Sequence, residues 1–192
     1  MAHYLLSEQL KQYTLSNHQQ LEKSLITQMR SINTHEEYVK FLQFFYSYFG
    51  ALEDKINQYI GAAQLVDHLQ RRKTESLLND IKTIRGIIPE KAKDADLPKI
   101  ENHLQAFGAL YVIEGSTLGG KIISKMMAKQ LNIENNKGLS FFSGYGEETE
   151  RMWASFKELL NRQPQNEADA ELIINAANDT FAKFKLWIEK NS

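Results

Sequence analysis

The chain has 192 residues, and its 23 basic and 24 acidic side chains give a formal net charge of -1. This balance argues against a nucleic-acid-binding protein, which carries an excess of positive charge, and the length fits one domain over residues 1–192. The absence of cysteine excludes disulfides, thiolate catalysis, Cys-ligated zinc and iron–sulfur clusters. The start, MAHYLLSEQLKQY, turns polar too early for a signal peptide, and no apolar run is long enough to span a bilayer. We therefore expect a cytoplasmic protein without a membrane segment.

The first part of the chain indicates two helical regions. Residues 3–30 are helical by pattern and free of proline. Thr34 is then placed as an N-cap with Glu37 three residues later, which is the capping-box signature of a helix start. The following helix, over 35–60, contains the aromatic run FLQFFYSYFGAL, and we expect it to be central in the core. Gly61 ends it.

Helices are predicted for most of the remaining chain as well. A polar amphipathic helix is expected over about 66–85, and Pro98 is placed to open the next helix. This central helix covers 103–129, and two further helices follow over 144–163 and 166–190. Because strand-like alternation is absent, the predicted fold class is all-α, with six or more helices packed around one core.

The central helix contains an unusual cluster of glycines. Gly115, Gly119 and Gly120 fall in its interior, where each glycine costs roughly 1 kcal/mol relative to alanine. Gly108, Tyr111, Gly115 and Gly119 are spaced i, i+3, i+7 and i+11, so they share one stripe of the helix. This stripe would be a groove of bare backbone against which a flat, bulky molecule can lie. Close packing of another helix is the alternative interpretation, and such a cluster is also where a long helix kinks.

Five histidines are present, and histidine is the commonest metal ligand and proton-transfer group near neutral pH. Four of them have neighbours typical of structural or surface positions. His3 is terminal, His35 lies in the first turn of a capped helix, and His68 sits among charged residues that suggest a solvated face. His103 lies nearly opposite the glycine stripe of its helix. His18 is the candidate that remains.

The residues around His18 suggest a metal-ligating role. Lys11, Leu15, His18 and Glu22 follow the spacing i, i+4, i+7 and i+11 and so share a helix stripe. A neutral imidazole can ligate heme iron, and its second ring nitrogen then needs an acceptor, which Glu22 could provide. Lys11 could pair with a propionate at the edge of such a ligand. An ordinary amphipathic helix with a few charges explains the same residues, so they leave the question open by themselves.

Two segments carry a resemblance to a known family. LYVIEGSTLGGKII closely resembles the distal-helix segment of bacterial heme oxygenases, and FFSGYGEETERMW resembles the stretch that follows it there. The resemblance covers most of the chain, and EGSTLGG together with the upstream histidine is its most specific part. Heme oxygenases hold heme between a proximal helix bearing the iron-ligating histidine and a kinked, glycine-rich distal helix. The resemblance implies the same helical fold here.

On the proximal side, the resemblance implies that His18 is the heme-iron ligand and that Glu22 is its hydrogen-bonding partner. Lys11 and Tyr111 match positions at which bacterial members contact the heme propionates.

On the distal side, the resemblance implies that Gly115, Ser116 and Gly119 form the reaction site, with the glycine backbone approaching the iron-bound oxygen. Gly120 is implied as a further heme-binding position. Mammalian members have an aspartate where Ser116 stands, whereas serine is usual in the bacterial branch, so no distal carboxylate organises the water there.

The activity implied by the resemblance is the oxidative opening of heme to biliverdin, CO and iron, with heme as both cofactor and substrate. It uses O₂ and electrons from an external donor, a ferredoxin- or flavoprotein-type reductase, since the chain has no flavin motif and no cysteine. Lys121, Lys125 and Lys129 could form a docking patch for that donor, although a solvated helix face is the favoured interpretation. The alternatives are a non-catalytic protein that binds heme or another ligand with the same fold, and a helical interaction domain without a ligand.

Overall fold

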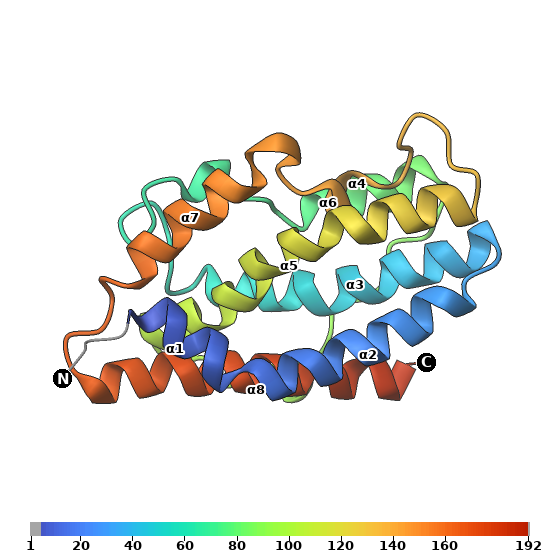
Figure 1. Cartoon of the computed structure of the whole chain (residues 1–192). Coiled ribbons are helices and arrows are strands. Elements are labelled where there is room, and N and C mark those ends of the chain that lie inside the picture. Colours follow the sequence, from blue (N-terminus) through green and yellow to red (C-terminus); the bar gives the residue numbers. More distant parts are fainter. Residues whose placement is uncertain (1–4, 192) are drawn as a thin grey trace.

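The computed structural model describes residues 5–191, so the expectation for His3 lies outside the described residues. Within them the chain forms α-helices and three short 3₁₀ turns without any strand, which confirms the predicted all-α fold (Figure 1). The helices are α1 (Leu6–Tyr13), α2 (Leu15–Ser31), α3 (His35–Ile56), α4 (Glu75–Thr83), α5 (His103–Gln130), α6 (Ser140–Ser143), α7 (Thr149–Leu160) and α8 (Glu167–Asn191). None of these helices combines the length and apolar character needed to cross a membrane.

Helix α3 is central in the core, as its aromatic run predicted. The capping box at its start is confirmed, because Thr34 Oγ1 accepts a hydrogen bond from the Glu37 amide at 3.1 Å and the Glu37 carboxylate accepts from the Thr34 amide at 3.0 Å. The helix is buried over most of its length and meets α8, where the Phe184 ring lies 4.8 Å from the rings of both Tyr48 and Phe49. Aromatic pairs at this spacing add to the stabilisation from apolar burial.

Helix α5 crosses α8 at very short range. A Cβ atom added to Gly108 would lie 2.3 Å from the Ile173 carbonyl oxygen and 2.8 Å from Ala176 Cβ. Only glycine permits this approach of the two backbones. The expectation that Gly108 contributes to an open groove is therefore wrong, because α8 fills the space beside it.

Several predicted boundaries need correction. Helix α3 ends at Ile56, before Gly61, and α7 begins at Thr149 instead of 144. The first helical region divides at Thr14 into α1 and α2, and Lys11 is on a different helix from His18. The helix expected over 66–85 is restricted to α4, because residues before it bond to other elements; for example, the Thr74 amide donates to Glu53 at 2.8 Å. Pro98 does not open α5, which begins after Asn102, whose side chain accepts from the Gln105 amide at 3.0 Å.

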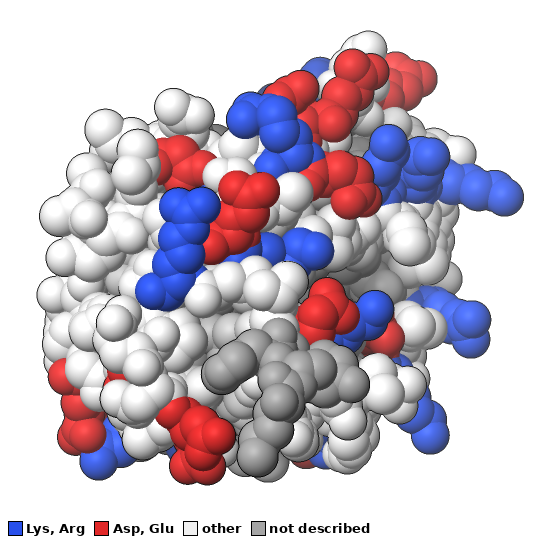
Figure 2. All heavy atoms as spheres, turned by 60° about the vertical axis from the view of Figure 1, so that its left-hand side comes forward, with Lys and Arg blue, Asp and Glu red and all other residues white. Residues whose placement is uncertain are grey.

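Charges of both signs are interspersed on the surface. On the face shown in Figure 2, basic and acidic side chains lie next to one another with broad uncharged areas between them. This distribution matches the formal net charge of -1, and it gives this face no extended field of one sign.

Candidate functional site

Helices α2 and α5 run in the same direction, and they contact each other's flanking residues near both ends. At one end Tyr111 of α5 lies beside Thr14, the residue before α2, and at the other the Gln130 amide donates to the carbonyl oxygens of Met29 and Ile32. The stretch between these two contacts is about 28 Å long in α5 and about 22 Å in α2, at 1.5 Å per residue. Figure 1 shows α5 lying well away from α2 in the middle of this stretch. Among residues 5–191, no hydrogen bond, ion pair or ring contact joins the two helices there.

Exposed side chains of both helices border this stretch, and several of them are apolar. We call this surface the α2–α5 face, and it consists of Leu15, His18, Glu22 and Ile26 of α2 with Leu118, Gly119 and Ile122 of α5. Ile122 is 71% exposed, which is unusual for an isoleucine in the middle of a long helix. The α2–α5 face therefore offers apolar surface that the described part of the chain leaves exposed.

His18 is available on this face. Its side chain is 49% exposed, and Nε2 lies 3.4 Å from Glu22 Oε1, one turn further along α2. The imidazole also packs against Phe181 of α8, with 5.3 Å between ring centroids. The structure thus brings together His18 and Glu22, as their spacing predicts. Because Glu22 contacts Nε2, ligation of a metal through that nitrogen requires the ring to turn so that Nδ1 faces the carboxylate.

Tyr111 and Lys11 both lie at the α1 end of the site. The Tyr111 side chain is buried, and burial raises the pKa of its hydroxyl although the nearby Thr14 side chain acts in the opposite direction. Its ring lies 5.4 Å from that of Trp153. Lys11 is exposed in the last turn of α1. A propionate contact by Tyr111 would therefore have to reach a buried hydroxyl beside Thr14.

The glycines of α5 fall into two groups according to what a side chain would meet. A Cβ atom added to Gly119 would have no neighbour within 4 Å, and one added to Gly115 would make an ordinary contact of 3.7 Å with Trp153. Neither position needs glycine for packing within the protein. At Gly120, in contrast, a Cβ atom would lie 2.4 Å from the Phe142 carbonyl oxygen. Gly120 is thus explained by the close approach of α6, and it faces that helix instead of the α2–α5 face.

Ser116, which the resemblance implies is part of the reaction site, has its hydroxyl hydrogen-bonded within the protein. Its Oγ donates to the Ile113 carbonyl oxygen at 2.6 Å and accepts from Arg72 Nη2 at 2.8 Å. Both bonds hold the hydroxyl on the side of α5 that meets the segment before α4. Helix α5 continues through all these residues, and the kink expected at the glycine cluster stays a prediction.

Sequence reasoning missed a buried polar network behind α5, which we call the Arg71–Glu114 network. Glu114 is 1% exposed, and its carboxylate accepts from Arg71 Nη1 at 3.0 Å and from the Tyr145 hydroxyl at 3.0 Å. Arg71 also binds Asp67 through two nitrogens, at 2.8 and 2.6 Å. Desolvation raises the pKa of Glu114, while the charges of Arg71 and Arg72 oppose that rise. The signal in the sequence was a glutamate in the middle of an apolar helix, because a buried charge needs a partner.

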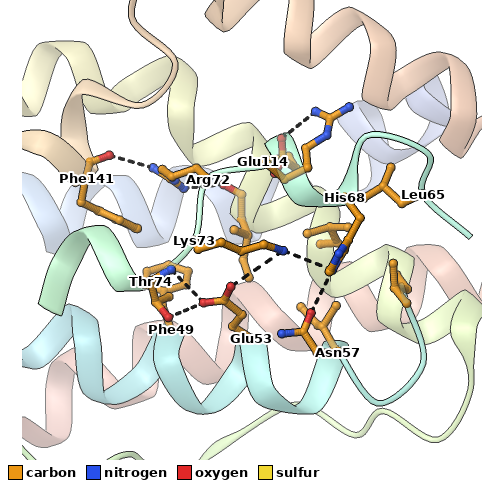
Figure 3. A pocket seen from close by; sticks show the side chains of 15 residues that line it. Phe49, Glu53, Asn57, Leu65, His68, Arg72, Lys73, Thr74, Glu114 and Phe141 are labelled. Atoms are coloured by element: carbon orange, nitrogen blue, oxygen red, sulfur yellow. Dashed lines mark hydrogen bonds and ion pairs between the residues drawn. The ribbon is translucent and has the colours of Figure 1, made fainter. Parts of the chain in front are cut away.

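A small cavity of about 30 Å³ lies beside this network, with room for about one water molecule. Figure 3 shows that Lys73, His68 and Glu53 extend toward one another at its edge. His68 Nε2 is 3.1 Å from Lys73 Nζ and 3.2 Å from Asn57 Oδ1, and desolvation together with the Lys73 charge lowers the pKa of this histidine. His68 is half-buried in a short 3₁₀ turn instead of lying on the helix expected there, and its contacts agree with the structural role expected for it.

Together these features define an all-α protein with exposed apolar side chains along α2 and α5. A sequence model of the heme oxygenase family matches residues 5–190. The chain belongs to the heme oxygenase family, and it is a heme-degrading oxidoreductase.

Relatives of known name agree with this assignment. Heme oxygenase PigA of Pseudomonas aeruginosa is 26% identical over 189 residues, which cover 97% of this chain and 92% of the relative. A heme oxygenase of Xanthomonas campestris pv. campestris is 30% identical over 117 residues, which cover 59% of this chain and 66% of the relative.

Two solved structures show that the fold is shared. The NO- and CO-bound heme oxygenase of Neisseria meningitidis superposes with a TM-score of 0.83 at 21% identity and covers 97% of this chain and 92% of that one. The heme oxygenase of Leptospira interrogans gives a TM-score of 0.77 at 19% identity, with 97% and 100% covered.

Proposed function

We propose that heme binds on the α2–α5 face and is opened there to biliverdin, CO and iron, with O₂ as oxidant and electrons from an external donor. The observation that carries this proposal is Gly119. A glycine inside a helix costs about 1 kcal/mol relative to alanine, and no contact among residues 5–191 requires the missing side chain at this position. A flat molecule outside the chain is the explanation that remains.

His18 would bind the iron from the α2 side. The histidine is exposed toward this face, and Glu22 at 3.4 Å supplies the carboxylate that fixes the tautomer and direction of an iron-ligating imidazole. The Phe181 ring of α8 packs against the imidazole. These contacts support a single neutral histidine as the iron ligand.

The residues of α5 would provide the opposite wall. When bound, heme supplies the iron that activates O₂ and the meso carbon that is oxidised. Gly115 and Gly119 leave space for O₂ and ordered water against bare backbone, and Trp153 limits that space on the Gly115 side. Ser116 and Gly120 would act indirectly, because they hold α5 against Arg72 and α6 respectively.

The heme edge and the electron donor form the finer part of the proposal. Lys11, which is exposed, would pair with a propionate at the α1 end of the site, and Tyr111 would contact the same end. Lys121, Lys125 and Lys129 are exposed along α5, where an acidic ferredoxin or flavoprotein could dock. A cytoplasmic location and one domain over residues 1–192 are also proposed, and the single contiguous apolar core supports the latter.

Hemin titration followed by turnover tests the proposal. We expect the wild-type protein to give a Soret band with histidine ligation and to form biliverdin when ascorbate or a ferredoxin–reductase pair supplies electrons. His18→Ala should lose that ligation, while His35→Ala, at an exposed position on α3, serves as the matched control. Wild-type protein that binds hemin but forms no biliverdin under either electron supply would contradict catalysis.

A further inference from the structure

The part of α2 that bears His18 has no buried apolar side chain of its own. From Leu15 to Gln20 every side chain is exposed or half-buried, and the first buried residue of the helix is Leu21. A helix is normally held in place by its buried apolar face. The orientation of residues 15–20 must therefore be set by polar contacts and by the neighbouring helix α8.

Asn178 of α8 makes such contacts. Its Nδ2 donates to the Tyr13 carbonyl oxygen at 3.3 Å, and its Oδ1 accepts from Asn17 Nδ2 at 2.7 Å. Tyr13 is the last residue of α1 and Asn17 lies in the first turn of α2, so one side chain bridges the break at Thr14. An asparagine amide suits this task because it carries a donor and an acceptor in one rigid plane.

The same face of α8 also touches the histidine itself. Phe181, three residues after Asn178, packs against the His18 imidazole, and Asn17 is the neighbour of His18 in the sequence. Helix α8 thus contacts both the ring and the backbone turn that carries it. Iron ligation is sensitive to ring direction, since a ligand shifted by about 0.5 Å or tilted by 10–20° no longer meets the metal productively.

We infer that Asn178 is a positioning residue that orients His18 for iron ligation by fixing the α1–α2 junction through Asn17 and Tyr13. The inference rests on the proposed function, since it takes His18 as the ligand. Asn178 acts through its neighbours and does not itself contact heme.

The first test uses the protein without heme. Asn178→Ala removes both hydrogen bonds, and Asn175→Ala is the matched control, because Asn175 is an exposed asparagine on the same helix. We expect amide hydrogen exchange over residues 15–20 to become roughly five- to thirtyfold faster in Asn178→Ala, the range that loss of one or two hydrogen bonds implies. Exchange in α3 should be unchanged in both variants.

The second test uses the hemin-loaded protein. Resonance Raman of ferrous heme reports the iron–histidine stretching band, which we expect to broaden and shift in Asn178→Ala and to match wild type in Asn175→Ala. Asn178→Asp keeps the acceptor for Asn17 but loses the donor to Tyr13, so its band should be intermediate. If Asn178→Ala fails to fold, Asn17→Ala is used instead in both measurements. It removes the same 2.7 Å hydrogen bond by changing the donor residue.

The outcomes separate this inference from the proposed function. An Asn178→Ala variant with the exchange rates and iron–histidine band of the control would overturn the positioning role. A wild-type band that survives in His18→Ala would show instead that His18 is not the ligand, whatever the exchange rates are.

Discussion

Because the space beside Gly119 is open, we expect side chains added there to stabilise the heme-free protein yet to impair its function. In the protein without heme, Gly119→Ala adds a Cβ atom that meets nothing within 4 Å, so the only change is the better helix propensity of alanine. We expect the free energy of unfolding to rise by about 1 kcal/mol, which corresponds to a Tm increase of about 2–4 °C for a chain of this size.

Gly120→Ala is the matched control for this experiment. It makes the same substitution one residue along α5, but its Cβ atom would lie 2.4 Å from the Phe142 carbonyl oxygen. Relief of that overlap requires movement of α5 or α6, and we expect a destabilisation of about 1–3 kcal/mol, as in other overpacked sites. Urea denaturation monitored by far-UV circular dichroism measures both variants.

The functional half of the prediction uses Gly119→Leu. Its side chain occupies the space proposed for O₂ and water, so the folded variant should bind hemin yet form biliverdin at a rate lower by about 100-fold, the effect of a misplacement of about 1 Å at a reacting centre. If Gly119→Ala is destabilised as much as Gly120→Ala, the space beside Gly119 is filled by the protein. A wild-type biliverdin rate in folded Gly119→Leu would mean that α5 does not line the reaction site.

Three further predictions address other parts of the site. His18→Ala should still take up hemin through apolar burial but lose five-coordinate histidine ligation, and unchanged ferric and ferrous spectra would refute the assignment. The Lys11→Ala, Tyr111→Phe double variant should change the ratio of biliverdin isomers more than hemin affinity, because the macrocycle rotates when its propionates are released; a constant ratio would place the propionates elsewhere. Burial, followed by the charge of Glu114, raises the pKa of Tyr145 to about 12 from about 10 in the unfolded chain. The stabilisation from this un-ionised hydroxyl is complete below pH 10 and is lost as the pH rises toward 12. The unfolding free energy of wild type should therefore fall more steeply over that range than that of Tyr145→Phe, and parallel curves would contradict the shift.

Local sequence determined the features that depend on neighbours along the chain. The capping box of Thr34 and Glu37 could be predicted because both partners lie within one turn, and the pairing of His18 with Glu22 follows from their i, i+4 spacing. The aromatic run of α3 likewise indicated a central helix, since so many large apolar side chains can be covered only from all sides. The family resemblance extended these features to a function, because the motif EGSTLGG is unusual for a helix interior.

Tertiary structure decided everything that depends on which elements meet. The glycines of α5 look alike in the sequence, yet Gly108 is required by α8, Gly120 by α6, and Gly119 by no contact that the structure describes. The break at Thr14 and the Arg71–Glu114 network were equally hidden, since the partners Asn178 and Glu114 lie far along the chain from the residues they hold. The physical reason for a glycine, a buried charge or a helix break lies in the atoms packed against it. Only the tertiary structure brings those atoms to that position.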